Sequence, residues 1–137
     1  MTTYVGARDA LISRLHSNWP TAYPTVPVYY ENNESVDMDT VGSAFLKVEL
    51  AFDDAEQASV EATPLMRVRG MLILGIMAKE GTGTRGGMTY LDYLVGLFKH
   101  QNLSGIQTGT PTPGHRESHN GWHLQELYVP FWFHSSS

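Results

Sequence analysis

Three histidines near the C-terminus have the spacing of a metal site. His115, His119 and His123 stand four residues apart, so on a helix their imidazoles would share one face and could bind zinc. The surrounding residues argue against a helix, because Pro113-Gly114 precedes the group and Asn120-Gly121 is a favoured hairpin-turn pair. We therefore predict polar loop histidines in this segment and no metal site.

A glycine-rich segment is the second candidate, in this case for phosphate binding. Residues 80–87 read Glu-Gly-Thr-Gly-Thr-Arg-Gly-Gly and lead from a predicted strand into a predicted helix, where backbone N–H groups can cradle a phosphate. The segment lacks the Gly-Lys-Ser/Thr ending of a P-loop, and no acidic ribose partner is apparent in a βαβ unit. Its composition predicts a mobile connection and no nucleotide site.

Acid–base and nucleophilic chemistry have no support in the spacing of side chains. No pattern brings two carboxylates together as a general acid and base, and there is no Gly-x-Ser-x-Gly nucleophile elbow. The chain has no cysteine, which excludes disulfides, thiolate metal sites and a cysteine nucleophile. We predict that the protein is not an enzyme and has no catalytic, cofactor-binding or metal-binding residues. A small metal- or nucleotide-dependent enzyme is the alternative from a different functional class.

Charged and polar side chains in two regions are candidates for a protein interface. Arg67 and Arg69 lie near one end of a predicted long strand, and Arg85 lies in the loop that follows its other end. A polar, acidic loop contributes Glu31, Asn32, Glu34 and Asp37. The arginines either pair with this loop across subunits or are exposed strand charges that discourage edge-to-edge aggregation. Both interpretations stay open, and all seven residues are interface candidates.

The hydrophobic pattern predicts helices and strands in the order α-β-β-β-α-β-β. The predicted helices span 4–16 and 89–100, and the predicted strands span 26–30, 44–53, 66–79, 102–108 and 124–133. Trp19-Pro20 and Pro24 should end the first helix, and residues 53–64 and 109–121 should be loops. Hairpin-like connections between the middle strands predict an α+β fold, with a single mostly antiparallel sheet and two helices packed on one face.

Two of the predicted strands have unusual features. The strand over 66–79 is long, and we expect its Arg-bearing end to project beyond the body of the domain. The last strand is apolar on both faces, because Phe131, Trp132 and Phe133 follow one another. This strand is therefore central in the sheet, or one of its faces meets another protein chain.

Composition limits the class of protein. The chain has 137 residues, 42% hydrophobic and 17% charged, which predicts one domain over 1–137 with a buried core. A formal net charge of −5 is unlike that of a general nucleic-acid binder. The longest apolar run, Met71–Ala78, is far shorter than the ~20 residues that span a bilayer, and no signal peptide is visible. We expect a soluble, cytosolic protein without a membrane partner.

Taken in order, these segments resemble the tail-terminator, or tail-completion, proteins of bacteriophages with long, non-contractile tails. The resemblance is carried by the helix ending in Trp19-Pro20, the strand Val26-Pro27-Val28-Tyr29-Tyr30-Glu31-Asn32, the strand Arg67-Val68-Arg69-Gly70-Met71-Leu72, the Gly81–Gly87 loop before a helix with Leu94, Leu97 and Phe98, and the closing strand Val129-Pro130-Phe131-Trp132-Phe133. The first of these strands is similar to the family's Pro-Val-x-x-x-Asn strand, and the second resembles its central strand. The loop over 108–121 matches nothing specific in the family and is a candidate contact with a neighbouring virion protein.

The resemblance implies a structural role in the virion. Members of the family form a hexameric ring on the last ring of the polymerised tail tube, stop its growth and present a surface to the head, while DNA passes through without specific binding. The implied partners are further copies of the chain, the major tail tube protein and a head–tail connector or neck protein. The implied place is the head-proximal end of the virion tail, after assembly in the host cytoplasm. A neck or head-closure protein is the alternative.

Overall fold

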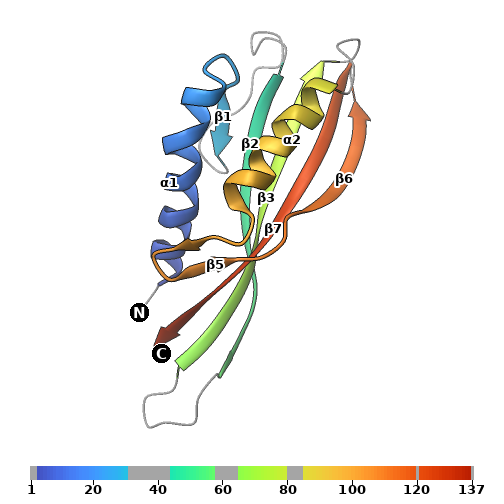
Figure 1. Ribbon diagram of the computed structural model, residues 1–137. Helices are drawn as coiled ribbons and strands as arrows, with labels where there is room; N and C mark the ends of the chain where they lie inside the picture. The colour runs from blue at the N-terminus through green and yellow to red at the C-terminus, as the bar shows by residue number, and fades with distance from the viewer. Residues whose placement is uncertain (1–2, 31–43, 58–64, 80–84, 120, 137) are drawn as a thin grey trace.

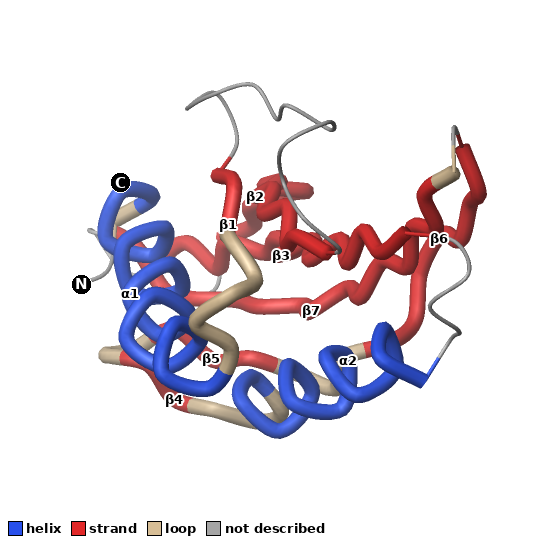
Figure 2. Tube along the Cα trace, turned by 90° about the horizontal axis from the view of Figure 1, so that it is seen from above, coloured by secondary structure: helices blue, strands red, loops and turns tan. Residues whose placement is uncertain are grey.

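A computed structural model describes residues 3–30, 44–57, 65–79, 85–119 and 121–136 of the chain (Figure 1). Helices α1 (Tyr4–Ala22) and α2 (Arg85–Phe98) lie on the same side of a seven-stranded sheet, as Figures 1 and 2 show. The strands are β1 (Val28–Tyr30), β2 (Ala44–Gln57), β3 (Leu65–Lys79), β4 (Asn102–Leu103), β5 (Ile106–Thr108), β6 (Thr112–His119) and β7 (Trp122–Ser136). The predicted α+β class, with the order α-β-β-β-α-β-β and a mostly antiparallel sheet, is confirmed, and the part after α2 contains four strands, β4 to β7, where two were predicted.

The sheet is built around β3 and β7. Its strand order is β1-β2-β3-β7-β5-β4, and β6 pairs with β7 as well. The two central strands run antiparallel over their whole length, from the pair Leu65–Ser136 to the pair Lys79–Trp122. β1 is parallel to β2, and the other described pairings are antiparallel. Because β7 has strand neighbours on both sides, its run of apolar residues matches the predicted central position.

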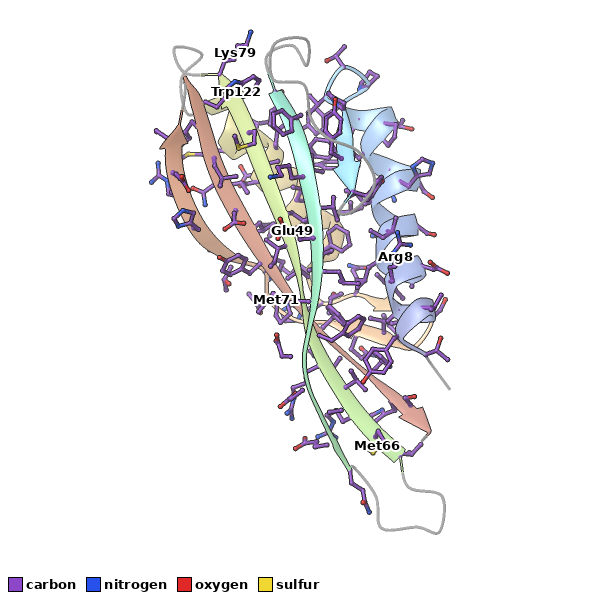
Figure 3. The ribbon with its side chains drawn as sticks, turned by 180° about the vertical axis from the view of Figure 1, so that it is seen from behind. Arg8, Glu49, Met66, Met71, Lys79 and Trp122 are labelled. Carbon is purple, nitrogen blue, oxygen red and sulfur yellow. The ribbon has the colours of Figure 1, made fainter. Side chains whose placement is uncertain are left out.

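The core lies between the helices and the sheet face that they cover. In α1 the buried residues are four positions apart and so form one stripe: Ala7, Leu11, Leu15 and Trp19. On the three long strands the buried residues of the core are at alternate positions: Leu46, Val48, Leu72, Leu74, Leu127, Val129, Phe131 and Phe133. α2 adds Leu94, Leu97 and Phe98. No helix of the described residues lies on the opposite face of the sheet (Figure 3).

The first helix extends past predicted residue 16 and past Trp19-Pro20, and it ends at Ala22, shortly before Pro24, the other predicted stop. Pro20 lies inside α1, which continues for two further residues. A proline removes one intrahelical hydrogen bond, which an α-helix would make to the carbonyl of His16, and His16 is an exposed residue. The last turn is still closed, because the Tyr23 backbone N–H donates to the Trp19 carbonyl at 2.8 Å.

Two predicted loops contain strand. β2 continues to Gln57, although residues 53–64 are predicted as a loop, and β7 continues to Ser136. The added residues at the ends of β2 and β7 both pair with β3, so hydrogen bonds to β3 stabilise them as strand although their sequence lacks an apolar pattern. The loop predicted over 109–121 is also wrong, because it contains β6. That strand forms a hairpin with β7 that turns at Gly121, whose φ of +80° favours glycine.

Thr108 fastens the end of α2 to the sheet. Its side chain is buried in β5, where its hydroxyl donates to the Phe98 carbonyl and accepts from the Gln101 backbone N–H at 2.7 Å. These bonds take the place of helical ones. α2 therefore ends at Phe98 instead of the predicted residue 100, and His100 adopts a φ of +50°.

Replacing Thr108 by valine is expected to lower the free energy of unfolding by about 2 kcal/mol, because two backbone groups lose a partner while the shape of the side chain is kept. Urea unfolding followed by circular dichroism measures this change. Thr110→Val is the matched control, since Thr110 is exposed and bonds to the His100 ring, and it should change stability by less than about 0.5 kcal/mol. Equal effects of the two substitutions would contradict the role given to Thr108.

Candidate functional site

Three strands form an arm that projects beyond both helices (Figures 1 and 3). Met66 lies near its tip, and Lys79 and Trp122 lie at the other end of the sheet (Figure 3). Every residue that β2 contributes to the arm is exposed. The projection predicted for the Arg-bearing end of the long strand is therefore present. The arm consists of residues 51–57, 65–70 and 131–136.

Two of the predicted interface residues, Arg67 and Arg69, pair with acids of the facing strand in the arm. Arg69 lies 2.8 Å from Glu56 and 3.5 Å from Asp54, and Arg67 lies 3.5 Å from Glu56. These side chains are 40% to 58% exposed, and exposed pairs of this kind contribute at most about 1 kcal/mol each. Asp54 and Glu56 are not among the predicted interface residues, because they fall in the loop predicted over 53–64. Continuing the strand through residue 57 would have placed them opposite the arginines.

The other predicted interface residues are not brought to the arm. Arg85 begins α2, which follows the end of β3 that lies away from the arm, and its side chain is not among those that the structure describes. The acidic-loop candidates lie outside the described residues: Glu31, Asn32, Glu34 and Asp37. Pairing between this loop and the arginines across subunits stays a prediction, and within the chain Arg67 and Arg69 already have acidic partners.

An aromatic cluster lies at the base of the arm. The ring of Tyr4 meets that of Phe52 edge-on with centroids 4.7 Å apart, and Phe133 lies 5.8 Å from the first and 6.4 Å from the second. Phe133 is buried, whereas Tyr4, Val5 and Phe52 are 48%, 68% and 39% exposed. Exposed apolar side chains that gather at one place are typical of contact surfaces. We refer to Tyr4, Val5 and Phe52 as the apolar patch.

Two outer strands of the sheet present an open edge. β1 pairs with Leu46–Val48 of β2, and no described strand lies outside β2 from Ala51 onward. On the other side of the sheet, β6 pairs with β7 along its inner edge, and no described strand lies beyond it. The backbone N–H and C=O groups of such edges can bond to a strand of another chain.

The histidines spaced by four do not gather in the part of the chain that the structure describes. His115 Nε2 lies 2.9 Å from a Glu117 carboxylate oxygen in β6, and His123 Nδ1 lies 3.2 Å from the Ser118 hydroxyl. The side chain of His119 is not among those that the structure describes. Within the described ranges, no three His, Asp or Glu side chains come close enough together to hold a metal ion.

Neither the glycine-rich segment nor the open face of the sheet shows a ligand site. Residues 80–84 of that segment lie outside the described part, and residues 85–87 form the first turn of α2. The open face has a hollow of about 40 Å³, far below the ~300 Å³ of a small ligand pocket. Its lining residues are Lys47, Glu49, Ile73, Gly75, Leu124 and Glu126. No helix among the described residues is long and apolar enough to span a membrane.

Comparison with known proteins decides the family. The sequence profile of the phage tail terminator protein matches residues 7–110. The chain belongs to the phage tail terminator family. The predicted resemblance is confirmed, and membership in this structural protein family places the chain in the tail of a phage virion. No sequence among curated proteins matches the chain.

Solved structures resemble this tail terminator in fold. Twelve chains match it, and one of them has a TM-score of 0.67 at 19% sequence identity, with 92% of each chain covered. At that identity the likeness shows a shared fold alone. It extends further along the chain than the family match, because residues 7–110 run only from α1 through β5.

The range that matches the tail terminator family contains part of the arm and part of the apolar patch. The matched range contains Phe52, Arg67 and Arg69, and so includes the β2 and β3 strands of the arm. Tyr4 and Val5 of the apolar patch lie before it, and β6 and β7 lie after it. The β2 and β3 strands of the arm, with the whole open edge of β2, are therefore in the part of the chain that the family profile recognises, and the β7 strand of the arm is outside it.

Proposed function

We propose that this chain forms a ring on the end of the phage tail tube, stops tube polymerisation there and provides the surface to which the head is joined. The observation that carries the proposal is the match to the tail terminator family over residues 7–110. On the pattern that the resemblance implies, the ring is a hexamer, and each subunit is one domain spanning 1–137. The continuous hydrophobic core of the described residues supports a subunit that acts as one body.

The proposed partners are other copies of the chain, the major tail tube protein on one side and a head–tail connector or neck protein on the other. DNA passes through the ring without specific binding. The net charge of −5 supports this, because a negatively charged protein does not hold a polyanion by electrostatic attraction. The ring is assembled in the host cytoplasm and stays at the head-proximal end of the tail.

The arm takes part in docking to the tube or to the neighbouring subunit. Arg69 is exposed there and Arg67 is partly exposed, and their ion pairs with Glu56 contribute little to stability, so these pairs can be exchanged for contacts with another protein. Arg85 and the acidic-loop residues are assigned the same role: Glu31, Asn32, Glu34 and Asp37. Charges on a contact rim raise the rate and the specificity of docking.

Replacing Arg69 by alanine is expected to lower the free energy of unfolding by less than about 1 kcal/mol, because its pairs with Asp54 and Glu56 are exposed to solvent. The same variant should need about tenfold more protein to cap tubes, as expected for the loss of one docking charge. Thermal unfolding and tube length are measured on one preparation. Lys99→Ala, which removes an exposed positive charge just past α2, is the control and should cap normally. Normal capping by the Arg69 variant would remove Arg69 from the docking surface.

Adding the purified chain to polymerising tail tube protein of the same phage tests the proposal. Tubes are expected to stop growing, and electron microscopy of negatively stained samples should show a ring at one end of each tube. The tube protein alone is the control and should continue to elongate. Tubes of equal length with and without the chain, with no added density at their ends, would contradict the proposal.

A further inference from the structure

We propose that neighbouring subunits of the ring join edge to edge, with the open edge of β2 in one copy pairing with the open edge of β6 in the next. The proposal rests on the proposed ring and names the two surfaces that form it. The occupant of each edge is therefore a second copy of this chain.

The two edges match in length and are both accessible. β2 is exposed at each of its last seven positions, Ala51–Gln57. β6 is 8 residues long, and its residues 115–118 are all exposed. Strands of this length can pair with each other through ladder hydrogen bonds, beyond the register irregularities at Phe52–Asp54 in β2 and Pro113–Arg116 in β6. A long exposed strand edge that stayed uncovered would invite uncontrolled aggregation, so a specific partner for it is expected.

Charges on the two edges complement each other. In β2, Asp54 and Glu56 are already paired with arginines of β3, whereas Asp53 is exposed and has no ion pair with any described side chain. In β6, Arg116 is exposed and likewise has no ion pair within the described ranges, while its neighbour His115 contacts Glu117. Asp53 of one copy and Arg116 of the next thus supply opposite charges to the same contact.

The charge pattern also selects the symmetry. A two-fold dimer through β2 would place Asp53, Asp54 and Glu56 against the same acids of the other copy, and like charges on paired strands repel. Pairing of β2 with β6 avoids this repulsion. Because the two edges lie on opposite sides of one sheet, each copy adds head to tail, and such a contact closes into a ring when the rotation per subunit allows it.

The apolar patch gives this contact a hydrophobic part. Phe52 precedes an irregularity in the β2–β3 register between Phe52 and Asp54, and Tyr4 of α1 packs against its ring. Such bulges are frequent at sheet edges, bend the strand locally and leave the extra residue, here Asp53, outside the ladder with β3. Interfaces combine a buried apolar centre with polar edges. The patch therefore lies where a strand added to β2 would cover it in part.

Because the chain has no cysteine, introduced cysteines test the pairing directly. Double variants combine a cysteine at Asp53 or Ala55 in β2 with one at Arg116 or Ser118 in β6, and are oxidised on tail tubes of the same phage. Within one chain the two edges are at least three strand spacings, about 14 Å, apart, and they are also displaced along the strands, because Asp54 lies opposite Arg69 whereas Arg116 is in register with Ile76 through Gln125. A disulfide needs Cα atoms within about 7 Å, so any bond formed must join two copies.

At least one double variant is expected to give a ladder of covalent oligomers up to the size of the ring, whereas each single-cysteine parent stops at dimers. The control pairs Arg116→Cys with Ser17→Cys, an exposed position on α1, and should give no ladder. If no edge pair gives a ladder while the unmodified chain still forms rings on tubes, edge pairing is overturned and the proposed function stands. If the unmodified chain forms no ring on tubes, both proposals fail.

Charge reversal provides an independent readout. Asp53→Arg and Arg116→Asp should each weaken association of copies about a hundredfold, because each places like charges in the contact. The double variant restores the opposite charges and should recover association. Both positions are exposed, so the melting temperature should not change and reports that the variants are folded. Rings that form equally well from both single variants would overturn the Asp53–Arg116 contact.

Discussion

Replacing Trp19 by alanine is expected to lower the free energy of unfolding by about 4 kcal/mol. The side chain is fully buried at the end of α1, and its indole N–H donates to the Val26 carbonyl at 3.0 Å. Its ring lies 4.8 Å from that of Tyr23, 5.8 Å from that of Tyr90 and 5.9 Å from that of Tyr93. The substitution would remove the contacts that join α1 to α2 and leave a cavity that the rigid elements around it cannot fill.

Urea unfolding of the alanine variant, followed by circular dichroism, gives the size of this effect. Trp19→Phe is the matched variant, because it keeps an aromatic ring and removes the indole donor. It should lose about 2 kcal/mol, from the unpaired Val26 carbonyl and the smaller ring. A loss below about 1 kcal/mol for the alanine variant would contradict the packing described for this cluster.

Replacing Gly70 by alanine is expected to lower the free energy of unfolding by about 3 kcal/mol. A Cβ at this position would lie 2.4 Å from Cζ of Phe131 and 2.6 Å from the backbone oxygen of Ala51. The Phe131 ring is packed in the core and has little room to shift. The Ala51 carbonyl belongs to the backbone of β2, so β2 and β3 would have to separate to make room for the new Cβ. Because Gly70 lies where the arm meets the core, the variant should also lose tube capping.

Gly96→Ala makes the test of Gly70 specific. Gly96 is exposed in α2, and a Cβ there would meet nothing within 4 Å. In a helix the change from glycine to alanine raises stability by about 1 kcal/mol, because glycine loses more backbone entropy on folding. The two alanine variants should therefore shift the urea midpoint in opposite directions. A Gly70 variant as stable as the unmodified chain would contradict the close approach of the strands.

The core of the fold could be predicted from the sequence, because buried residues recur at a regular spacing along each helix and strand. Leu46 and Val48 alternate with polar residues in β2, and Ala7, Leu11 and Leu15 recur four apart in α1. These patterns identify the element types, their order and the layer of helices on one face. They do not locate element ends, which depend on single contacts such as the Thr108 hydroxyl that closes α2.

The arm tip and β6 could not be predicted in the same way. They are strands because they form hydrogen bonds with a neighbouring strand, and their sequences show no alternation of apolar residues. Asp53, Asp54 and Glu56 have the composition of a loop, yet they lie in β2 opposite or beside the start of β3. β6 contains Pro113 and no large apolar residue, and its pairing with β7 makes it a strand. The same residues form the proposed subunit contact.

Tail length in the absence of the protein tests its role as a terminator most directly. Tails from a phage that lacks this gene would be measured by electron microscopy and compared with tails from the intact phage. Nothing would then stop the addition of tube subunits, so we predict tails far longer than normal that are not joined to heads. Unjoined tails of normal length would contradict the account, because they would show that the tube is terminated without this protein and that it acts at the neck instead.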